Sequence, residues 1–115
     1  MINITALEQF EKITETQTFG QRPAEYLKDT IADILRYADF IYQMYLFPAG
    51  DPDRLEELGQ RRSSAHNKVI ADLNMLRRMF QQLGLGDLFE GAELNDRNDY
   101  KIAAFELLSA LMSQN

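Results

Sequence analysis

The segment 34–47, ILRYADFIYQMYLF, constrains the fold of this chain more than any other stretch. Apart from its tyrosines, its only polar residues are Arg36, Asp39 and Gln43, which recur at helical spacing. A helix that is apolar over most of its circumference must be covered on more than one side. Because monomers rarely expose large apolar patches, we expect this helix to lie at the centre of a bundle, or else to form a homodimer interface as well.

Two apolar stripes run along this second helix, and Pro23 suits its first turn. The main stripe is predicted to contain Leu27, Ile31, Ile34, Leu35, Ala38, Ile41 and Tyr45. The other stripe contains Tyr37, Phe40, Met44 and Phe47. Core packing is the expected fate of this aromatic stripe, although Tyr and Phe left exposed would be good interface anchors.

Capping residues predict the ends of the other helices. The first helix is expected to begin near Thr5, where TALE fits a capping box with Glu8. Asp51 and Pro52 predict the start of a long third helix, which Gly84 would end.

The last helix is predicted from about Asp96 to Met112, after a loop anchored by Leu88 and Phe89. No segment reads as a strand. Residues 1–115 are therefore expected to form a single helical domain, folded as an all-α antiparallel bundle of four helices. The count would rise to five helical segments if Gly59 splits the third helix.

Composition excludes several chemistries. The 115 residues include no cysteine and one histidine, so disulfides and thiolate metal sites are excluded and no metal site is expected. No glycine-rich phosphate loop follows a strand, and no cofactor is predicted. No apolar run is long enough to span a membrane. Together these features favour a cytoplasmic protein.

The charge distribution is uneven. The net charge is −6, yet residues 54–83 carry six basic and three acidic residues. An overall excess of acids argues against DNA binding, which requires phosphate charges to be neutralised. The basic third helix could contact RNA or an acidic partner, and an acidic protein suits a basic partner surface.

Arg61 and the only histidine, His66, form the pattern R-x-x-x-x-H in RRSSAH. This pattern resembles the motif of the HEPN superfamily of small all-helical proteins, many of which are metal-independent RNases. The resemblance implies that Arg61 and His66 pair across a dimer as catalytic residues, with Asn67 nearby. RNA would be the partner only under this hypothesis.

Helix geometry favours a structural role for His66 instead. Residues five apart on a regular helix point about 140° from each other, so Arg61 and His66 converge only if the helix begins between them, with Ser63 as the cap, or bulges. His66 lies in the apolar stripe that includes Val69 and Leu73. We therefore expect a partly buried histidine, hydrogen-bonded to a carboxylate or carbonyl of a neighbouring helix. Arg62 would form a similar contact between helices.

The leading functional hypothesis is a non-enzymatic module that binds another protein. The wider segment RRSSAHNKVIADLNMLRR resembles helices of small uncharacterised bacterial and phage-associated proteins, a resemblance that implies no activity. An inhibitor or regulator carried by a phage or mobile element would fit, and anti-CRISPR-like binding proteins are one example. The alternatives are the HEPN-like RNase and a self-associating structural protein.

One polar face of the third helix is a candidate partner-binding surface. It consists of residues at helical spacing, namely Asn67, Ala71, Asn74, Arg78 and Gln81. Small and amide side chains allow a partner to approach closely and to form hydrogen bonds. The alternative is that this face contacts only water.

Overall fold

The computed structural model describes residues 2–17, 21–46 and 50–113. Within these ranges the chain forms four helices and no strand: α1 (Ile4–Thr16), α2 (Gln21–Leu46), α3 (Pro52–Gln82) and α4 (Arg97–Ser113). The all-α, four-helix prediction is confirmed.

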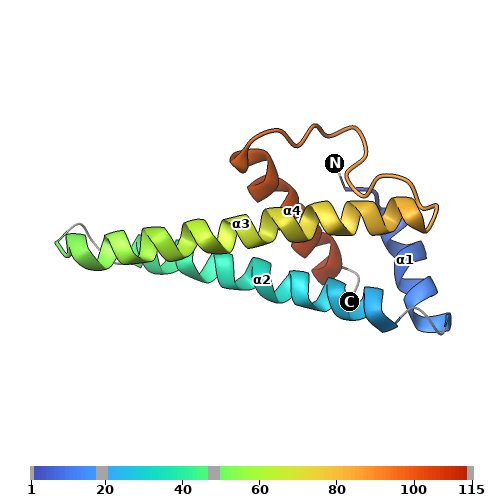
Figure 1. Ribbon diagram of the computed structural model, residues 1–115, viewed down its shortest axis with the longest axis horizontal. Coiled ribbons are helices and arrows are strands. Elements are labelled where there is room, and N and C mark those ends of the chain that lie inside the picture. Colours follow the sequence, from blue (N-terminus) through green and yellow to red (C-terminus); the bar gives the residue numbers. More distant parts are fainter. Residues whose placement is uncertain (1, 18–20, 47–49, 114–115) are drawn as a thin grey trace.

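The two long helices, α2 and α3, lie antiparallel and form an elongated hairpin (Figure 1). The shorter helices α1 and α4 run across this hairpin rather than along it, which gives a molecule of 52 × 27 × 24 Å. α2 packs against each of the other three helices. The apolar helix is therefore central, as its sequence predicted.

The start of α1 differs from the sequence prediction. Helix α1 begins at Ile4 because the side chain of Asn3 accepts a hydrogen bond of 3.1 Å from the N–H of Ala6. The predicted cap at Thr5 is therefore wrong. Asparagine is at least as good a cap as threonine, and here it lies two residues earlier.

The predicted limits of α3 and α4 are confirmed. Asp51 caps α3 by accepting from the N–H of Arg54 at 3.1 Å, and Pro52 is the first helical residue. At the start of α4, Asp96 accepts from the N–H of Asp99 at 2.9 Å. Asp99 accepts in return from the N–H of Asp96 at 3.2 Å, which forms a reciprocal cap.

Helix α3 continues through Gly59, so the structure has no fifth helical segment within the described ranges. A Cβ at Gly59 would lie 3.8 Å from the Cε of Met44, an ordinary van der Waals contact, so the packing of α2 does not require a glycine here. The helix ends before Gly84, which has a φ of 74°. Glycine adopts this left-handed conformation without steric cost, as a helix C-terminus often requires.

Two corrections concern the stripe on α2. Leu35 and Tyr45 were placed on the buried stripe, but they are 52% and 87% exposed. Tyr37 and Phe40 of the aromatic stripe are buried, as expected, and Phe47 lies outside the described residues. Because α2 is apolar nearly all round, periodicity alone could not tell which apolar side chains face α3.

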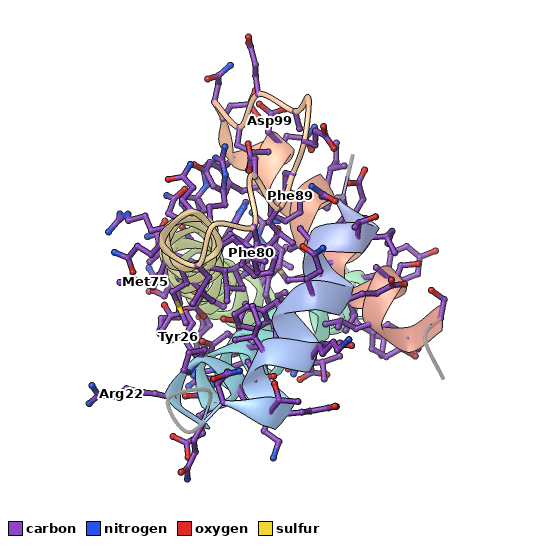
Figure 2. All side chains as sticks on the ribbon, turned by 90° about the vertical axis from the view of Figure 1, so that its right-hand side faces the viewer. Arg22, Tyr26, Met75, Phe80, Phe89 and Asp99 are labelled. Carbon is purple, nitrogen blue, oxygen red and sulfur yellow. The ribbon has the colours of Figure 1, made fainter. Side chains whose placement is uncertain are left out.

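The core lies where α1, α3 and α4 meet α2. Phe10 of α1 stacks on Phe80 of α3 with ring centroids 4.6 Å apart. Figure 2 shows Phe80 and Phe89 in the interior, whereas Arg22 points outward. The largest fully buried apolar side chains are Phe10, Phe80, Phe89, Leu7, Ile34, Leu58, Leu73, Leu76, Leu88, Leu107 and Val69.

The loop after α3 is anchored as its sequence predicted. Leu88 and Phe89 are fully buried. Asp87 receives two hydrogen bonds of 3.2 Å from Arg77 and one of 3.1 Å from the N–H of Phe89. The N–H of Asn3 donates to the carbonyl of Leu88 at 2.7 Å, which links the start of α1 to this loop.

Candidate functional site

His66 lies near the middle of α3 and faces α2. Its ring packs on Tyr37, with centroids 4.6 Å apart and planes inclined by 30°. The residue is 7% exposed, and its Nε2 is buried without a hydrogen-bond partner among the described residues. The predicted burial of His66 is confirmed. The predicted hydrogen bond to a neighbouring helix stays a prediction, although the backbone of Arg97 in α4 acts to raise the pKa of His66.

The surroundings of His66 disfavour its charged form. Burial lowers the pKa of His66 from its ordinary value of 6.5, and the nearby charge of Arg97 acts in the same direction. Arg62 and Lys101 add smaller effects of the same sign, while the backbone of Arg97 opposes them. The imidazole is therefore more readily neutral than an exposed histidine.

Arg62 does not form the predicted ionic contact between helices. The start of α4 brings Arg97 and Lys101 toward this part of α3, and both act on His66 as positive charges. Within the described ranges, no carboxylate forms an ion pair with Arg62. Sequence periodicity indicates that another helix packs against this face of α3. It does not indicate whether the residues of that helix which face Arg62 are acidic or basic.

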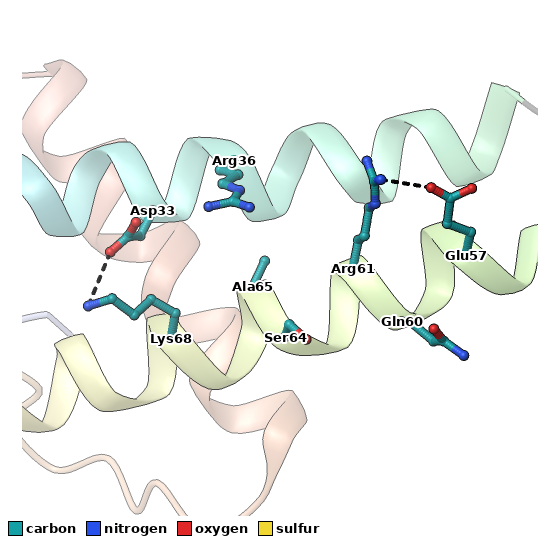
Figure 3. A pocket seen from close by; sticks show the side chains of 8 residues that line it. All are labelled: Asp33, Arg36, Glu57, Gln60, Arg61, Ser64, Ala65 and Lys68. Carbon is teal, nitrogen blue, oxygen red and sulfur yellow. Dashed lines mark ion pairs between the residues drawn. The ribbon is translucent and has the colours of Figure 1, made fainter. Parts of the chain in front are cut away.

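Arg61 lies in a groove between α2 and α3 (Figure 3), and His66 is not among the residues that line this groove. Arg61 forms an ion pair of 2.7 Å with Glu57. The groove has a volume of about 550 Å³ and is lined by Asp33, Arg36, Glu57, Gln60, Arg61, Ser64, Ala65 and Lys68. Within one chain, the structure therefore does not bring Arg61 and His66 into one site. Pairing by the HEPN pattern would require a second copy and the exposure of His66.

A pair of carboxyl groups beside this groove was not found from the sequence. Asp72 is 1% exposed, and its Oδ1 accepts from Lys68 at 2.7 Å and from Tyr26 at 3.2 Å. Its Oδ2 is buried without a partner among the described residues. Asp33 of α2 lies opposite, with its carboxylate 3.6 Å from Nζ of Lys68.

The interaction between the two carboxyl groups changes the protonation of Asp33. A hydrogen bond with Asp72 raises the pKa of Asp33 to about 6, and burial and the charge of Asp72 act in the same direction. Lys68 opposes this increase. A protonated Asp33 supplies a donor for Asp72, whose Oδ2 otherwise has none. No sequence signal identifies this pair, because its members are 39 positions apart on different helices.

The predicted amide face of α3 is partly occupied by α4. Asn67 accepts a hydrogen bond of 2.6 Å from Arg97, and Asn74 accepts one of 2.9 Å from the hydroxyl of Tyr100. Ala71, Arg78 and Gln81 are exposed. The two asparagines thus hold α4 in place. A partner at this face would meet mainly the other three residues.

The exposed face of α2 is the largest row of apolar side chains that the fold leaves uncovered within the described ranges. Leu35, Tyr42 and Leu46 are 52%, 60% and 55% exposed, and they recur at positions i, i+7 and i+11. These three residues define the α2 outer face. Tyr45, which is 87% exposed, lies next to it. The sequence predicted that Tyr37 and Phe40 are core residues, and they are buried. It did not identify Leu35, Tyr42 and Leu46 as an exposed row.

A separate apolar hollow of about 620 Å³ lies between the start of α1 and α4. Its lining consists of Ile2, Ile4, Ile102, Phe105, Glu106, Ser109 and Ala110.

Among the described residues, no three potential ligands are grouped as a metal ion would require. None of the described helices combines the length and apolar character needed to cross a membrane.

Comparison with protein-family models, with curated proteins and with solved structures gave no match for this chain. The candidate sites therefore rest on the geometry of the molecule itself.

Proposed function

We propose that this chain is a non-enzymatic protein-interaction module that docks a partner protein on the α2 outer face. The proposal includes an inhibitor or regulator encoded by a phage or mobile element, of which anti-CRISPR-like binding proteins are one example. The observation that carries it is the exposure of Leu35, Tyr42 and Leu46 in one row along a long helix.

The position of this row supports docking from outside. The contacts of α2 with α3 involve Tyr26, Asp33 and Tyr37. Each residue turns a helix by about 100°, so Leu35 points about 160° away from Tyr37. The α2 outer face is therefore turned away from α3, where a partner helix or loop has access.

The chemistry of the row suits a protein partner. Exposed tyrosines combine a large apolar surface with a hydroxyl group, and they are enriched among residues that dominate binding energy. Beside the row, Asp39 and Gln43 form a hydrogen bond of 2.7 Å. An apolar centre with a polar edge is the usual organisation of a protein interface. The net charge of −6 favours a partner with a basic surface.

The test places a photo-crosslinking amino acid at Tyr42, at Gln81 of the amide face, and at Glu8 of α1 as a control. We expect one protein of the native host to crosslink from position 42 only. That protein is then purified, and its affinity is measured by calorimetry. Leu35→Glu should weaken binding by at least about tenfold, because it places a charge in the apolar centre of the interface.

Other outcomes contradict the proposal in distinguishable ways. Crosslinking from position 81 alone would move the interface to the amide face. Crosslinking of the chain to itself, with a dimer in light scattering, would favour the self-associating structural protein. Equal affinity for the Leu35→Glu variant would remove the α2 outer face from the interface.

A further inference from the structure

We propose that the crossing of α3 and α4 is an anion-binding site for a phosphoryl group, formed by Arg62, Arg97 and Lys101. This site lies on another side of α3 from the groove that it forms with α2. It is independent of the proposed docking face on α2, so either can fail without the other.

Arg97 is held in place by uncharged groups. Its Nη1 donates to the side-chain oxygen of Asn67 at 2.6 Å. Its Nη2 donates to the carbonyl and the hydroxyl of Ser63 at 3.3 and 3.4 Å. A guanidinium carries five N–H donors, so these contacts leave donors free. They also fix its orientation without neutralising its charge, which prepares it for an anion.

Two more cations lie close enough to His66 to act on the same imidazole as Arg97. Lys101 follows Arg97 by four residues and shares its face of α4. Arg62 precedes His66 by four residues and shares its face of α3. In the described part of the chain, none of the three cations forms an ion pair with a carboxylate. The lowered pKa of His66 supports the proximity of the three cations, because each of them acts to lower it.

The nearest acids in the sequence are engaged elsewhere. Asp96 and Asp99 form the reciprocal cap of α4, and Asp99 also accepts from the N–H of Asn95 at 3.0 Å. Two residues along a helix correspond to about 200°, so Asp99 and Lys101 point in nearly opposite directions. Neither carboxylate forms an ion pair with any of the three cations.

The groove between α2 and α3 provides a contrast within the same molecule. There Arg61 lies 2.7 Å from Glu57, and Lys68 lies 2.7 Å from Asp72. Those cations already have anionic partners, whereas the cations at the α3–α4 crossing do not. An external anion would therefore bind at the crossing without breaking an ion pair, whereas in the groove it would compete with Glu57 and Asp72.

A phosphoryl group matches this site better than a carboxylate does. A phosphate monoester carries about −1.5 to −2 charges and three strong acceptor oxygens at neutral pH. A carboxylate carries one charge, which is less than three cations can accommodate. Binding would offset the positive field at His66, so the pKa of His66 should rise when the site is occupied.

The only histidine of the chain gives a direct readout by NMR. Inorganic phosphate, pyrophosphate and acetate are titrated separately at constant ionic strength, and the Cε1–H resonance of His66 is followed. We expect a saturable shift with phosphate and a tighter one with pyrophosphate. Arg97→Gln and Lys101→Gln should each weaken binding by about tenfold, as loss of a charge-assisted hydrogen bond implies. Arg78→Gln, which removes an exposed cation of α3, is the control.

Lys101→Gln leaves the contacts of Arg97 intact, so the proposal stays testable if Arg97→Gln does not fold. Occupancy by phosphate should also raise the pKa of His66 in the wild-type protein. A shift that grows without saturation overturns the proposal, as does equal binding by the wild type and both variants. An acetate response equal to that of phosphate would show general screening instead of a phosphoryl site.

Discussion

Tyr37 of α2 and His66 of α3 form a ring contact in the interior of the hairpin, with centroids 4.6 Å apart. The contact explains why the lone histidine is buried, because the tyrosine ring covers one face of the imidazole. It also places the imidazole beneath the cations of α4. The first prediction follows from that position.

The first prediction concerns acid pH. Because the pKa of His66 is lowered from 6.5, the folded state binds its proton less tightly than the unfolded chain does. The stability from this site is present above pH 6.5 and is lost as pH falls through the lowered pKa. We expect His66→Leu to remove this loss. Urea denaturation should then show a smaller decrease in unfolding free energy on acidification for the variant than for the wild type. Parallel pH profiles would contradict this.

The second prediction has the opposite sign. The pKa of Asp33 is raised from 3.8 to about 6, so its contribution is present below pH 3.8 and is lost as pH rises through about 6. Asp33→Asn supplies a permanent donor for Asp72 and removes the repulsion. We expect this variant to be more stable than the wild type at neutral pH, by about 1 kcal/mol. The advantage should disappear toward pH 4.

The exposed carboxylate of Asp29, on the same helix, provides the control for this comparison. Asp29→Asn should show no such pH-dependent gain. If Asp33→Asn is no more stable than Asp29→Asn at neutral pH, the two carboxyl groups do not share a proton in solution.

The helices of this fold and the burial of His66 could be predicted from the sequence. The residues that surround His66 could not. Caps at Asp51 and Asp96 are local signals, and each was located within a residue or two. The face of α2 that meets α3 was misplaced at Leu35, because nearly every direction around this helix is apolar. The Asp33–Asp72 pair and the approach of Arg97 to Asn67 depend on how separate helices pack. No pattern along the chain encodes them.

The third prediction separates buried from exposed tyrosines on α2. Tyr37 is 3% exposed, whereas Tyr42 is 60% exposed. Tyr37→Ala should lower the unfolding free energy by about 3 to 5 kcal/mol, as large-to-small core substitutions do. Tyr42→Ala should change it by less than about 0.5 kcal/mol. Thermal or urea unfolding measures both free energies. Similar losses of unfolding free energy for the two variants would show that α2 presents a different face to α3.

The fourth prediction concerns the loop between α3 and α4. Burial acts to raise the pKa of Asp87, but hydrogen bonds from Arg77 and from the N–H of Phe89 outweigh it and lower the pKa. Asp87→Ala removes both contacts and loosens the anchor of Leu88. We expect a loss of about 1 to 2 kcal/mol at neutral pH, which diminishes below pH 3.8. A loss that is independent of pH would argue against the ion pair.

The fifth prediction addresses the RNase hypothesis. His66 is buried, and Arg61 is paired with Glu57 in a different part of α3. We expect no cleavage when the purified protein is incubated with mixed RNA and EDTA. Cleavage by the wild type that is lost in both His66→Ala and Arg61→Ala would instead establish the HEPN-like pair, and light scattering would then be expected to show a dimer.

Both the buried role of His66 and the anion site depend on the position of one imidazole inside the molecule, under a cluster of cations. An NMR pH titration of His66 in the free protein, without phosphate, measures this most directly. We expect a pKa below 6.5, because burial and three positive charges disfavour the imidazolium. A pKa at or above 6.5 would mean that the ring is exposed or lies beside a carboxylate, and it would contradict both the buried role of His66 and the cationic crossing of α3 and α4.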